Sequence, residues 1–159
     1  MKTIVVLSDT HGNLAPLERI SAVLAECDYI LHLGDTLSDM RGIFNTYPEK
    51  TYLIAGNNDF CGEGEIVLDV EGCRIFACHG HRYGVKSGKQ KLAEAAKSRG
   101  CDIALFGHTH QPFTGMEEGV LCVNPGCMTR FAPSATYCYL VIHGKKAVPT
   151  LVEIPHGND

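Results

Sequence analysis

The N-terminal half of the chain alternates between short apolar runs and polar, glycine-containing segments. The apolar runs cover residues 2–7, 29–33 and 51–55. Runs of this length that end in Gly, Asp or Asn are typical of strands buried on both faces of a sheet. Between them, residues 14–24 carry apolar side chains at helical spacing, and residues 38–44 predict a shorter helix. This alternation of strand and helix predicts parallel β/α units.

The longer of these two helices has a recognisable start. Its apolar positions are Leu14, Leu17, Ile20, Val23 and Leu24. Asn13 is placed to be the N-cap, since its short side chain can accept a hydrogen bond from a free N–H of the first turn. Pro16 falls within that turn, where its missing N–H costs no hydrogen bond. We therefore expect one helix that starts after Asn13.

The C-terminal half contains apolar runs that are paired across turns. Strands are expected at residues 65–70, 74–79, 102–106, 114–116, 120–123, 136–142 and 148–154. Turn residues join three of the pairs, at Glu71-Gly72, Glu117-Glu118-Gly119 and Gly144-Lys145-Lys146. One further helix is expected at about residues 89–97. Since β/α units lead into hairpins, we expect an α/β fold of two stacked sheets with helices outside, rather than a doubly wound sheet.

The size and composition of the chain fit one folded domain over residues 1–159. Hydrophobic residues make up 45% of the sequence, which excludes disorder as the main state. The formal net charge is −4 and like charges form no block, so binding to long nucleic-acid tracts or anionic membranes is not expected. No apolar segment approaches the length of a membrane span or a signal-peptide core, and we expect a cytoplasmic protein.

Eight cysteines stand in the sequence, and no two of them form a C-x-x-C pair. They are Cys27, Cys61, Cys73, Cys78, Cys101, Cys122, Cys127 and Cys138. Without an export signal a disulfide framework is not expected, and the spacing of a zinc ribbon is absent. Several lie in apolar runs, where a free cysteine behaves as a small hydrophobic residue. We expect mainly this role, with redox or metal roles as the alternative.

Side chains that can bind metal ions follow five of the expected strands. They are, in chain order, Asp9 and His11, Asp35, Asn57, His79, and His108 and His110. Ligands of open α/β sheets gather outside the carboxyl ends of the strands, so we expect these side chains to meet at one edge. Each group alone is common in turns. The recurrence of carboxylate, imidazole and amide side chains at five strand ends is what indicates a metal site.

The number of candidate ligands predicts two ions, because the 7 side chains are too many for one tetrahedral site. Two ions roughly 3.5–4 Å apart that share a carboxylate can activate a bridging hydroxide and stabilise an in-line displacement at phosphorus. Two divalent ions with two carboxylates leave a charge of about +2, which attracts an anionic substrate. The sequence thus predicts a hydrolase of phosphate esters.

The same residues carry a resemblance to a known family. The series Asp9-x-His11, Gly34-Asp35, Gly56-Asn57-x-Asp59, His79 and Gly107-His108-x-His110 resembles the motifs of the calcineurin-like metallophosphoesterase superfamily, in the same order. His79-Gly80-His81, Asn124-Pro125-Gly126 and the compact length resemble its small single-domain phosphodiesterase branch. That branch also contains the retromer subunit of vacuolar sorting, which works as a scaffold.

The resemblance implies a fold, a cofactor and a set of ligands. The implied fold is a four-layer α/β/β/α sandwich of two stacked mixed sheets flanked by helices. The implied cofactor is a pair of divalent ions, with Mn²⁺ as the resident metal and Ni²⁺, Zn²⁺ or Fe²⁺ able to replace it. The implied ligands are Asp9, His11 and His110 for the first ion, Asn57, His79 and His108 for the second, and Asp35 as the bridge.

Asn58 departs from the family pattern. Many members have a histidine after the metal-binding asparagine, as an acid for the leaving group or as a phosphate contact. Asparagine offers only a neutral amide donor, so we expect hydrolysis of diesters rather than monoesters. The expected catalytic residues are Asp35, Asn58 and His79. The expected substrate contacts are Asn13, Asn58, His81 and Arg82.

Three other polar residues have separate expectations. Asp59 is a candidate for orienting a metal ligand from outside the coordination shell. Arg130 is a candidate to reach the site from the loop after Asn124-Pro125-Gly126. His32 lies within an expected strand and is expected to be a core or interface histidine with satisfied hydrogen bonds.

The favoured function is a metal-dependent phosphodiesterase acting on a small phosphodiester, with no membrane partner. Two alternatives stay open: a phosphomonoesterase acting on a small metabolite, and a non-catalytic metal-binding interaction scaffold. A scaffold has no physical reason to retain every ligand. A nuclease that tracks long nucleic acid lacks the basic stripe with interleaved aromatic residues that such binding needs. A homodimer or a higher homo-oligomer is also left open.

Overall fold

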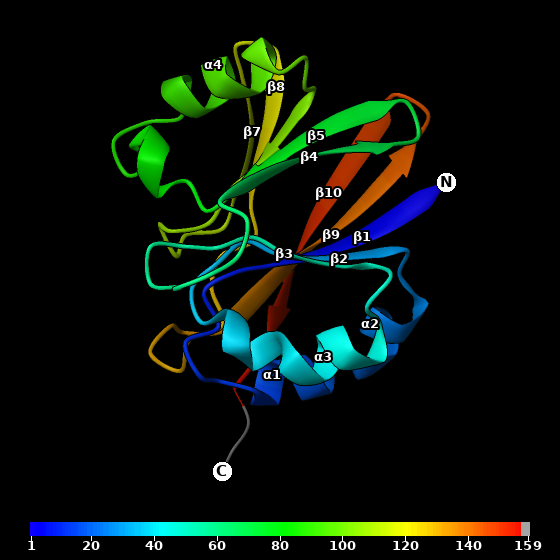
Figure 1. The fold of residues 1–159 in the computed structure, drawn as a ribbon, viewed down its shortest axis with the longest axis vertical. Coiled ribbons are helices and arrows are strands. Elements are labelled where there is room, and N and C mark those ends of the chain that lie inside the picture. The colour runs from blue at the N-terminus through cyan, green and yellow to red at the C-terminus, as the bar shows by residue number, and fades with distance from the viewer. Residues whose placement is uncertain (157–159) are drawn as a thin grey trace.

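The computed structural model describes residues 1–156, and its strands form two mixed five-stranded sheets (Figure 1). The first sheet has the order β10-β9-β1-β2-β3 and the second the order β4-β5-β6-β8-β7. The first contains β1 (Lys2–Leu7), β2 (Tyr29–His32), β3 (Thr51–Leu53), β9 (Ala135–His143) and β10 (Lys146–Ile154). The second contains β4 (Glu65–Val70), β5 (Cys73–Cys78), β6 (Ile103–Leu105), β7 (Phe113–Glu117) and β8 (Val120–Asn124). Within each sheet three neighbouring strands are parallel, β1-β2-β3 and β5-β6-β8, and the rest pair antiparallel.

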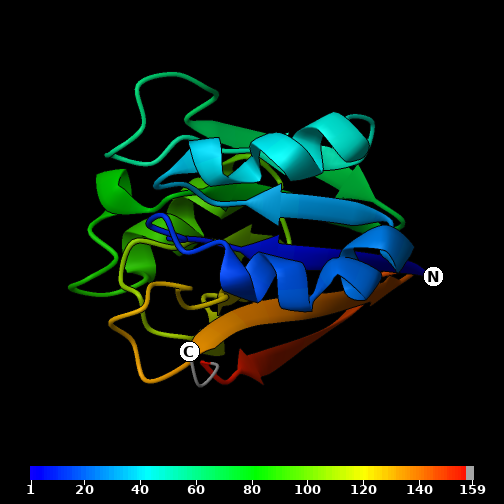
Figure 2. The same ribbon diagram turned by 90° about the horizontal axis from the view of Figure 1, so that it is seen from below.

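Helices cover the outer face of each sheet, as Figures 1 and 2 show. The first sheet carries α1 (Ala15–Arg19), α2 (Ser21–Glu26), the 3₁₀ turn η1 (Leu37–Met40) and α3 (Arg41–Thr46). The second carries the 3₁₀ turn η2 (His81–Tyr83) and α4 (Gln90–Ser98). The expected sandwich of two stacked mixed sheets between helices is confirmed. Among the described residues, no helix is long and apolar enough to cross a membrane, and the cytoplasmic location stays a prediction.

The core consists of three apolar clusters, one between the sheets and one under each helical layer. Strand β1 contributes to two of them, because its side chains alternate between the two faces of the sheet. Ile4 and Val6 pack between the sheets, and Val5 and Leu7 pack under α1 and α2. All four side chains are fully buried. Burial on both faces explains why the strand is a continuous apolar run in the sequence.

The start of the first helical segment differs from the expectation. The helix breaks at Ile20, whose N–H donates to the Pro16 carbonyl at 3.3 Å and closes α1 before α2 begins. Leu14, and not Asn13, is the N-cap, and no side chain caps the helix there. The Asn13 amide instead donates to the carbonyl of Met128 at 2.8 Å. The Asn13 side chain, which the local pattern assigns to the cap, therefore binds a loop that is distant in sequence.

All eight cysteines are free thiols, and seven of them are buried. Burial raises the pKa of Cys122 to about 11 and that of Cys138 to about 12, so these thiols stay protonated at neutral pH. Cys61 is the exposed one, on the loop after β3. The expectation that the cysteines are mainly small hydrophobic side chains is confirmed for the seven.

This distribution predicts how the native protein reacts with a thiol reagent. Dithionitrobenzoate should modify one cysteine per chain rapidly in buffer and eight after denaturation, since only the Cys61 thiol is accessible. The Cys61→Ser variant, with the same exposed surface, should show no rapid phase. Rapid modification of a second thiol in that variant would contradict the burial of the other seven.

Candidate metal centre

The loops that follow β1, β2, β3, β5 and β6 meet at one end of the two stacked sheets (Figures 1 and 2). The carboxyl ends of parallel strands point to the same edge of a sheet, so the two parallel sets bring their following loops together. Each of the expected ligands comes from one of these loops. They are Asp9, His11, Asp35, Asn57, His79, His108 and His110.

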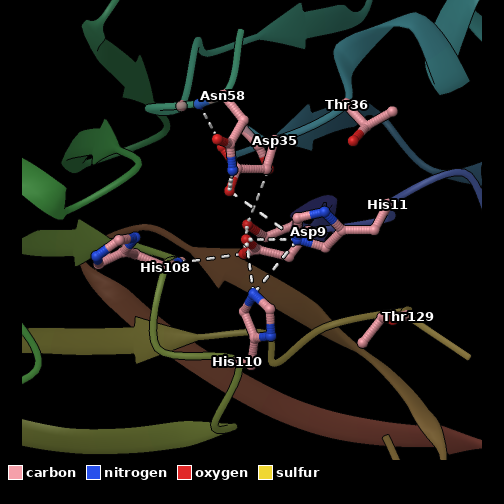
Figure 3. Close-up of polar contacts among 12 residues, drawn as sticks. Asp9, His11, Asp35, Thr36, Asn58, His108, His110 and Thr129 are labelled. Atoms are coloured by element: carbon pink, nitrogen blue, oxygen red, sulfur yellow. Dashed lines mark hydrogen bonds and ion pairs between the residues drawn. The ribbon is translucent and has the colours of Figure 1, made fainter. Parts of the chain in front are cut away.

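Asp9 lies at the middle of this group (Figure 3). Its side chain is fully buried, and its Oδ1 atom has no hydrogen-bond partner among residues 1–156. That oxygen faces the Nε2 atoms of His110 at 3.2 Å, His11 at 3.5 Å and His79 at 4.0 Å. The other oxygen, Oδ2, accepts hydrogen bonds from the Ser8 hydroxyl and from the His108 backbone N–H. One carboxylate oxygen is thus held by the protein and the other is left facing imidazoles.

Asp35 supplies the second carboxylate of the group. Its Oδ2 lies 3.5 Å from His79 Nε2 and 3.9 Å from His11 Nε2. The backbone N–H of Asn58 donates to Asp35 Oδ1 at 3.1 Å, and the Asn58 amide donates to Oδ2 at 3.0 Å. Burial by itself raises the pKa of Asp35, but the neighbouring His79 and the two hydrogen bonds from Asn58 outweigh it and lower the pKa. Asp35 is therefore a carboxylate at neutral pH.

The hydrogen bonding of His79 fixes which of its nitrogens faces the carboxylates. Its Nδ1 lies 2.8 Å from the carbonyl oxygen of Leu33, which only accepts hydrogen bonds. Nδ1 is therefore the protonated nitrogen of the neutral ring, and Nε2 presents a lone pair to Asp9 and Asp35. A cation bound between the His79 nitrogen and the two carboxylates would be attracted by the lone pairs of all three side chains. A metal-binding histidine commonly has this arrangement, with the remote nitrogen donating to a carbonyl.

The donor atoms are spaced as the ligands of a metal ion are. Two groups of side chains have ligand atoms within 4.8 Å of one another: Asp9 with His11 and His110, and Asp9 with Asp35 and His79. An ion bound at about 2.0–2.2 Å to each ligand separates neighbouring ligand atoms by roughly 3–4 Å. Together with the orphaned Asp9 Oδ1, this spacing means that the residues present fit divalent transition-metal ions.

The grouping agrees with the expected ligand sets in part. Asp9, His11 and His110 come together as implied for the first ion. Asp35 and His79 come together near the expected second ion, with His108 Nδ1 at 3.2 Å from His79 Nε2. Asp9 belongs to both groups, which the sequence did not indicate. Asn57 is exposed and precedes the Asn58 that binds Asp35, and its role as a ligand stays a prediction.

Most of these ligands have a left-handed backbone conformation, which is uncommon for residues other than glycine. The φ angles are 54° at Asp9, 46° at His11, 69° at Asp35, 70° at His108 and 63° at His110. Such conformations are unfavourable by about 1–3 kcal/mol each and gather at functional sites. The loops therefore hold strained conformations that aim several ligands into one small volume.

A close approach of two backbones brings Asp35 and His79 together. A Cβ atom built on Gly34 would lie 2.6 Å from the Gly56 nitrogen and 2.8 Å from His79 Nδ1. A Cβ on Gly56 would overlap an oxygen of Asp35. Glycine is required at both positions, because any side chain would push apart the loops after β2 and β3.

Asp59 joins these same two loops and contacts the backbone of Asp35, as expected for a residue that orients a candidate ligand. Its carboxylate accepts hydrogen bonds from three backbone N–H groups, those of Asp35 at 2.7 Å, Gly56 at 2.8 Å and Leu37 at 3.0 Å. The backbone at Asp35 is thereby fixed from the loop that carries Asn58. Asn124 has a similar role on the other sheet, where its amide donates to the Gly107 carbonyl and to the Thr109 hydroxyl, each at 3.0 Å.

His32 is a core histidine with satisfied hydrogen bonds, as expected from its position in a strand. Its Nδ1 accepts the N–H of Gly34 at 3.0 Å, and its Nε2 lies 3.0 Å from the Thr10 hydroxyl. Since Nδ1 accepts, the neutral ring carries its proton on Nε2 and donates it to Thr10. Complete burial lowers the pKa of His32 to about 4. Through its two hydrogen bonds His32 links the loops that carry Asp9 and Asp35, a role that its place in an apolar strand does not indicate.

The expected substrate contacts lie around the group at different distances from it. His81 has its ring centroid 5.5 Å from that of His79, and its Nδ1 is buried without a hydrogen-bond partner within residues 1–156. Arg82 lies against Gly64 on the loop that precedes β4. The side chains of Asn13 and Asn58 are bound to Met128 and Asp35. Contact of these four residues with a substrate stays a prediction.

Comparison with known proteins agrees with this geometry. A family model, described as the calcineurin-like phosphoesterase superfamily domain, matches residues 1–147. The chain belongs to this superfamily. A Mycoplasma pneumoniae protein named "Probable metallophosphoesterase" is 33% identical over 150 residues, which cover 88% of this chain and 89% of that protein. Phosphodiesterase YfcE of Escherichia coli is 25% identical over 158 residues, which cover 81% of this chain and 80% of YfcE.

Solved structures of two other proteins share the fold. A Streptococcus pneumoniae protein described as a predicted phosphoesterase superposes with a TM-score of 0.80 at 25% identity, covering 96% of this chain and 89% of that one. Vps29 of Entamoeba histolytica, solved with zinc, superposes with a TM-score of 0.76 at 18% identity, covering 95% of this chain and 98% of that one. At this identity the likeness to Vps29 concerns the fold alone. The chain is thus a metallophosphoesterase-family protein with candidate metal-binding residues.

The buried His32 predicts a dependence of stability on pH. The unfolded chain binds a proton at this residue below about pH 6.5, whereas the folded chain resists protonation down to about pH 4. The stability contributed by neutral His32 is therefore present above pH 6.5 and lost as the pH falls toward 4, by up to about 3 kcal/mol.

Urea unfolding of the metal-free protein at pH 7, 6, 5 and 4 measures this loss. His32→Gln should be less stable than the native chain at pH 7 and should lose less stability on acidification. His143→Gln, a change at an exposed position, should keep the native slope. An equal loss on acidification in the native chain and His32→Gln would contradict a neutral buried His32.

Proposed function

We propose that the chain hydrolyses phosphodiesters at a centre of two divalent metal ions, with Mn²⁺ as the resident metal. The observation that carries the proposal is the buried Oδ1 of Asp9, which faces three imidazole nitrogens without a donor of its own. Relatives named phosphodiesterase, from Escherichia coli and Methanocaldococcus jannaschii, support the ester type at 25% identity each.

The proposed ligand sets contain the side chains of both donor groups and add His108 and Asn57, with Asp35 as the bridge although Asp9 is the member that both groups share. Asp9, His11 and His110 hold the first ion, and His79, His108 and Asn57 hold the second, with Asp35 bridging. When bound, such paired ions supply a hydroxide nucleophile at neutral pH and stabilise the charge that develops on the phosphoryl and leaving oxygens. The same charge attracts the phosphate group, which has to approach a protein of formal net charge −4.

The protein side chains orient the metal ligands, and none of them is an obvious strong acid that could protonate the leaving group. Asn58 donates to Asp35 and holds the carboxylate that the two ions share. Its amide cannot protonate a leaving oxygen, so substrates whose leaving group is already a weak base are favoured. Diesters of acidic alcohols, such as phenols, meet this condition. We therefore expect diesters to be hydrolysed in preference to monoesters.

Turnover of bis(4-nitrophenyl) phosphate by metal-stripped protein, with and without added Mn²⁺, tests the proposed function. Activity should be absent after chelation and return with Mn²⁺, and Ni²⁺, Zn²⁺ or Fe²⁺ should restore it to differing extents. Failure of all four ions to restore turnover would favour a non-catalytic metal-binding scaffold. Restored turnover of 4-nitrophenyl phosphate alone would favour a monoesterase.

The bridging role of Asp35 predicts a joint loss of both ions. Asp35→Asn removes the negative charge of the carboxylate that both ions share. Metal affinity should fall by more than about 100-fold, since even partners outside the coordination shell contribute about 10–100-fold. Elemental analysis after dialysis should show most metal lost from both sites, together with the activity. Asp69→Asn, an exposed change on β4, is the matched control. Two ions retained at native affinity in Asp35→Asn would rule out the bridge.

The identity of residue 58 predicts the ester preference. Asn58→His introduces a side chain that can donate a proton to the leaving oxygen or contact the extra charge of a monoester. The ratio of monoester to diester turnover should rise, by up to the roughly 10²–10⁴-fold that a positioned acid contributes. The comparison uses 4-nitrophenyl phosphate and bis(4-nitrophenyl) phosphate, whose leaving group is the same. Faster cleavage of the monoester by the native chain would show that Asn58 does not set the preference.

A further inference from the structure

A cleft of about 500 Å³ opens beside the metal centre, next to His110. Its floor includes Cys127 and Thr129, and its walls come from Gln111 and Pro112 on one side and from the loop 129–134 on the other. Figure 3 shows Thr129 on the chain segment that passes the centre beside His110. The volume lies within the range of sites that take small organic ligands, roughly 300–1,000 Å³. His110 belongs both to the candidate ligands and to the lining of the cleft, so the cleft adjoins the place where a phosphate would bind.

The cleft has a mixed lining in which the apolar side chains gather on the loop 129–134 and at Pro112. Phe131, Ala132 and Pro133 face it from the loop, and Pro112 faces it from the segment after His110. Phe131 is 97% exposed, so almost its whole ring is in contact with water in the free protein. Large apolar side chains left open at the rim of a concave site gain stability when a ligand covers them. Aromatic rings also pair favourably with other flat rings.

The loop that carries Phe131 is held in place by hydrogen bonds at both ends. At its base the backbone N–H of Met128 donates to the Asp9 carbonyl at 3.1 Å, and the Met128 carbonyl accepts the Asn13 amide at 2.8 Å. Further along, the Ala132 carbonyl lies 2.8 Å from His156 Nε2. Because the base of the loop is bound to the segment of Asp9, the cleft has a fixed position relative to the metal centre.

The charge at the far wall selects the chemistry of the ligand. Glu153 on β10 also lines the cleft, where it is the cross-strand neighbour of Thr136 on β9. An anionic group would meet this carboxylate, whereas an uncharged ring would not. Arg19 and Arg130 line a separate pocket together with Gly12. The cleft beside His110 thus offers exposed apolar side chains and one carboxylate, and neither arginine.

We propose that the cleft formed by His110, Pro112, Thr129 and Phe131 binds one ester arm of the substrate, and that this arm is an uncharged aromatic ring. The inference rests on the proposed phosphodiester hydrolysis and names the class of substrate: diesters with at least one aryl or heteroaromatic alcohol. Phe131 stacks on the ring, while the phosphate group occupies the metal centre. Phe131 is a specificity-determining residue that contacts the arm and takes no part in bond breaking.

Binding of two slowly reacting diesters to the Mn²⁺-loaded protein tests the assignment. Isothermal titration should show that diphenyl phosphate binds about 10-fold more tightly than dimethyl phosphate, because only the former carries apolar arms to bury. Phe131→Ala should weaken the binding of diphenyl phosphate by roughly 3–10-fold and leave the binding of dimethyl phosphate unchanged. Phe131→Tyr should retain the native preference, since it keeps the ring. Phe60→Ala is the matched control, because Phe60 is also fully exposed at this end of the molecule but does not line the cleft.

A charged arm tests the role of Glu153. Bis(4-carboxyphenyl) phosphate carries a carboxylate on both rings, so a charged ring has to enter the cleft beside Glu153. It should bind the native protein no more tightly than diphenyl phosphate, and Glu153→Gln should improve its binding without changing that of diphenyl phosphate. Tighter binding of the carboxylated diester by the native protein would overturn the assignment of an uncharged arm.

The remaining outcomes separate this inference from the proposed function. If the protein hydrolyses bis(4-nitrophenyl) phosphate but binds diphenyl and dimethyl phosphate equally, the cleft assignment is wrong and the hydrolysis stands. Equal effects of Phe131→Ala and Phe60→Ala also overturn it. If diphenyl phosphate binds through Phe131 but no diester is hydrolysed, the proposed function is wrong and the cleft stands. If neither binding preference nor hydrolysis is found, both are wrong.

Discussion

The buried carboxylate oxygen Oδ1 of Asp9 imposes the condition that the rest of the site has to meet. It has no hydrogen-bond donor among residues 1–156, and imidazole nitrogens lie 3.2–4.0 Å from it. An uncompensated charge in such a place costs several kcal/mol. A neutral His79 ring carries a single N–H, on Nδ1, and donates it to the Leu33 carbonyl. Its Nε2 therefore has no proton to donate to Asp9. Bound cations remove this conflict, so the same arrangement that is costly without metal becomes favourable with it.

The fold fixes Asp9 from both sheets at once. Its backbone N–H donates to the Gly34 carbonyl of the loop after β2 at 2.9 Å. Its carbonyl accepts the N–H of Met128, and its Oδ2 accepts the N–H of His108, which follow strands of the second sheet. These bonds join loops that are distant in sequence but meet at one end of the stacked sheets (Figure 2). The sandwich is therefore what makes a site of ligands from five strand ends possible.

The strands and the positions of the candidate ligands at their ends could be predicted from the sequence, because their signals are local. Strand β1 coincides with the apolar run Lys2–Leu7, and Asp9 follows directly after it. The contacts that support the ligands could not be predicted, because their partners are far along the chain. Asn13 looks like an N-cap in its own segment, yet its amide binds Met128. Asn58 looks like a substrate contact, yet its amide holds Asp35.

Anomalous diffraction from crystals grown with Mn²⁺ tests the central claim most directly. The claim is that Asp9, Asp35 and the histidines around them bind two ions that share a carboxylate. Two anomalous peaks are expected roughly 3.5–4 Å apart, one against His11 and His110 and the other against His79, with Asp35 touching both. A single peak, or ions bound away from Asp9 and Asp35, would contradict the two-metal centre.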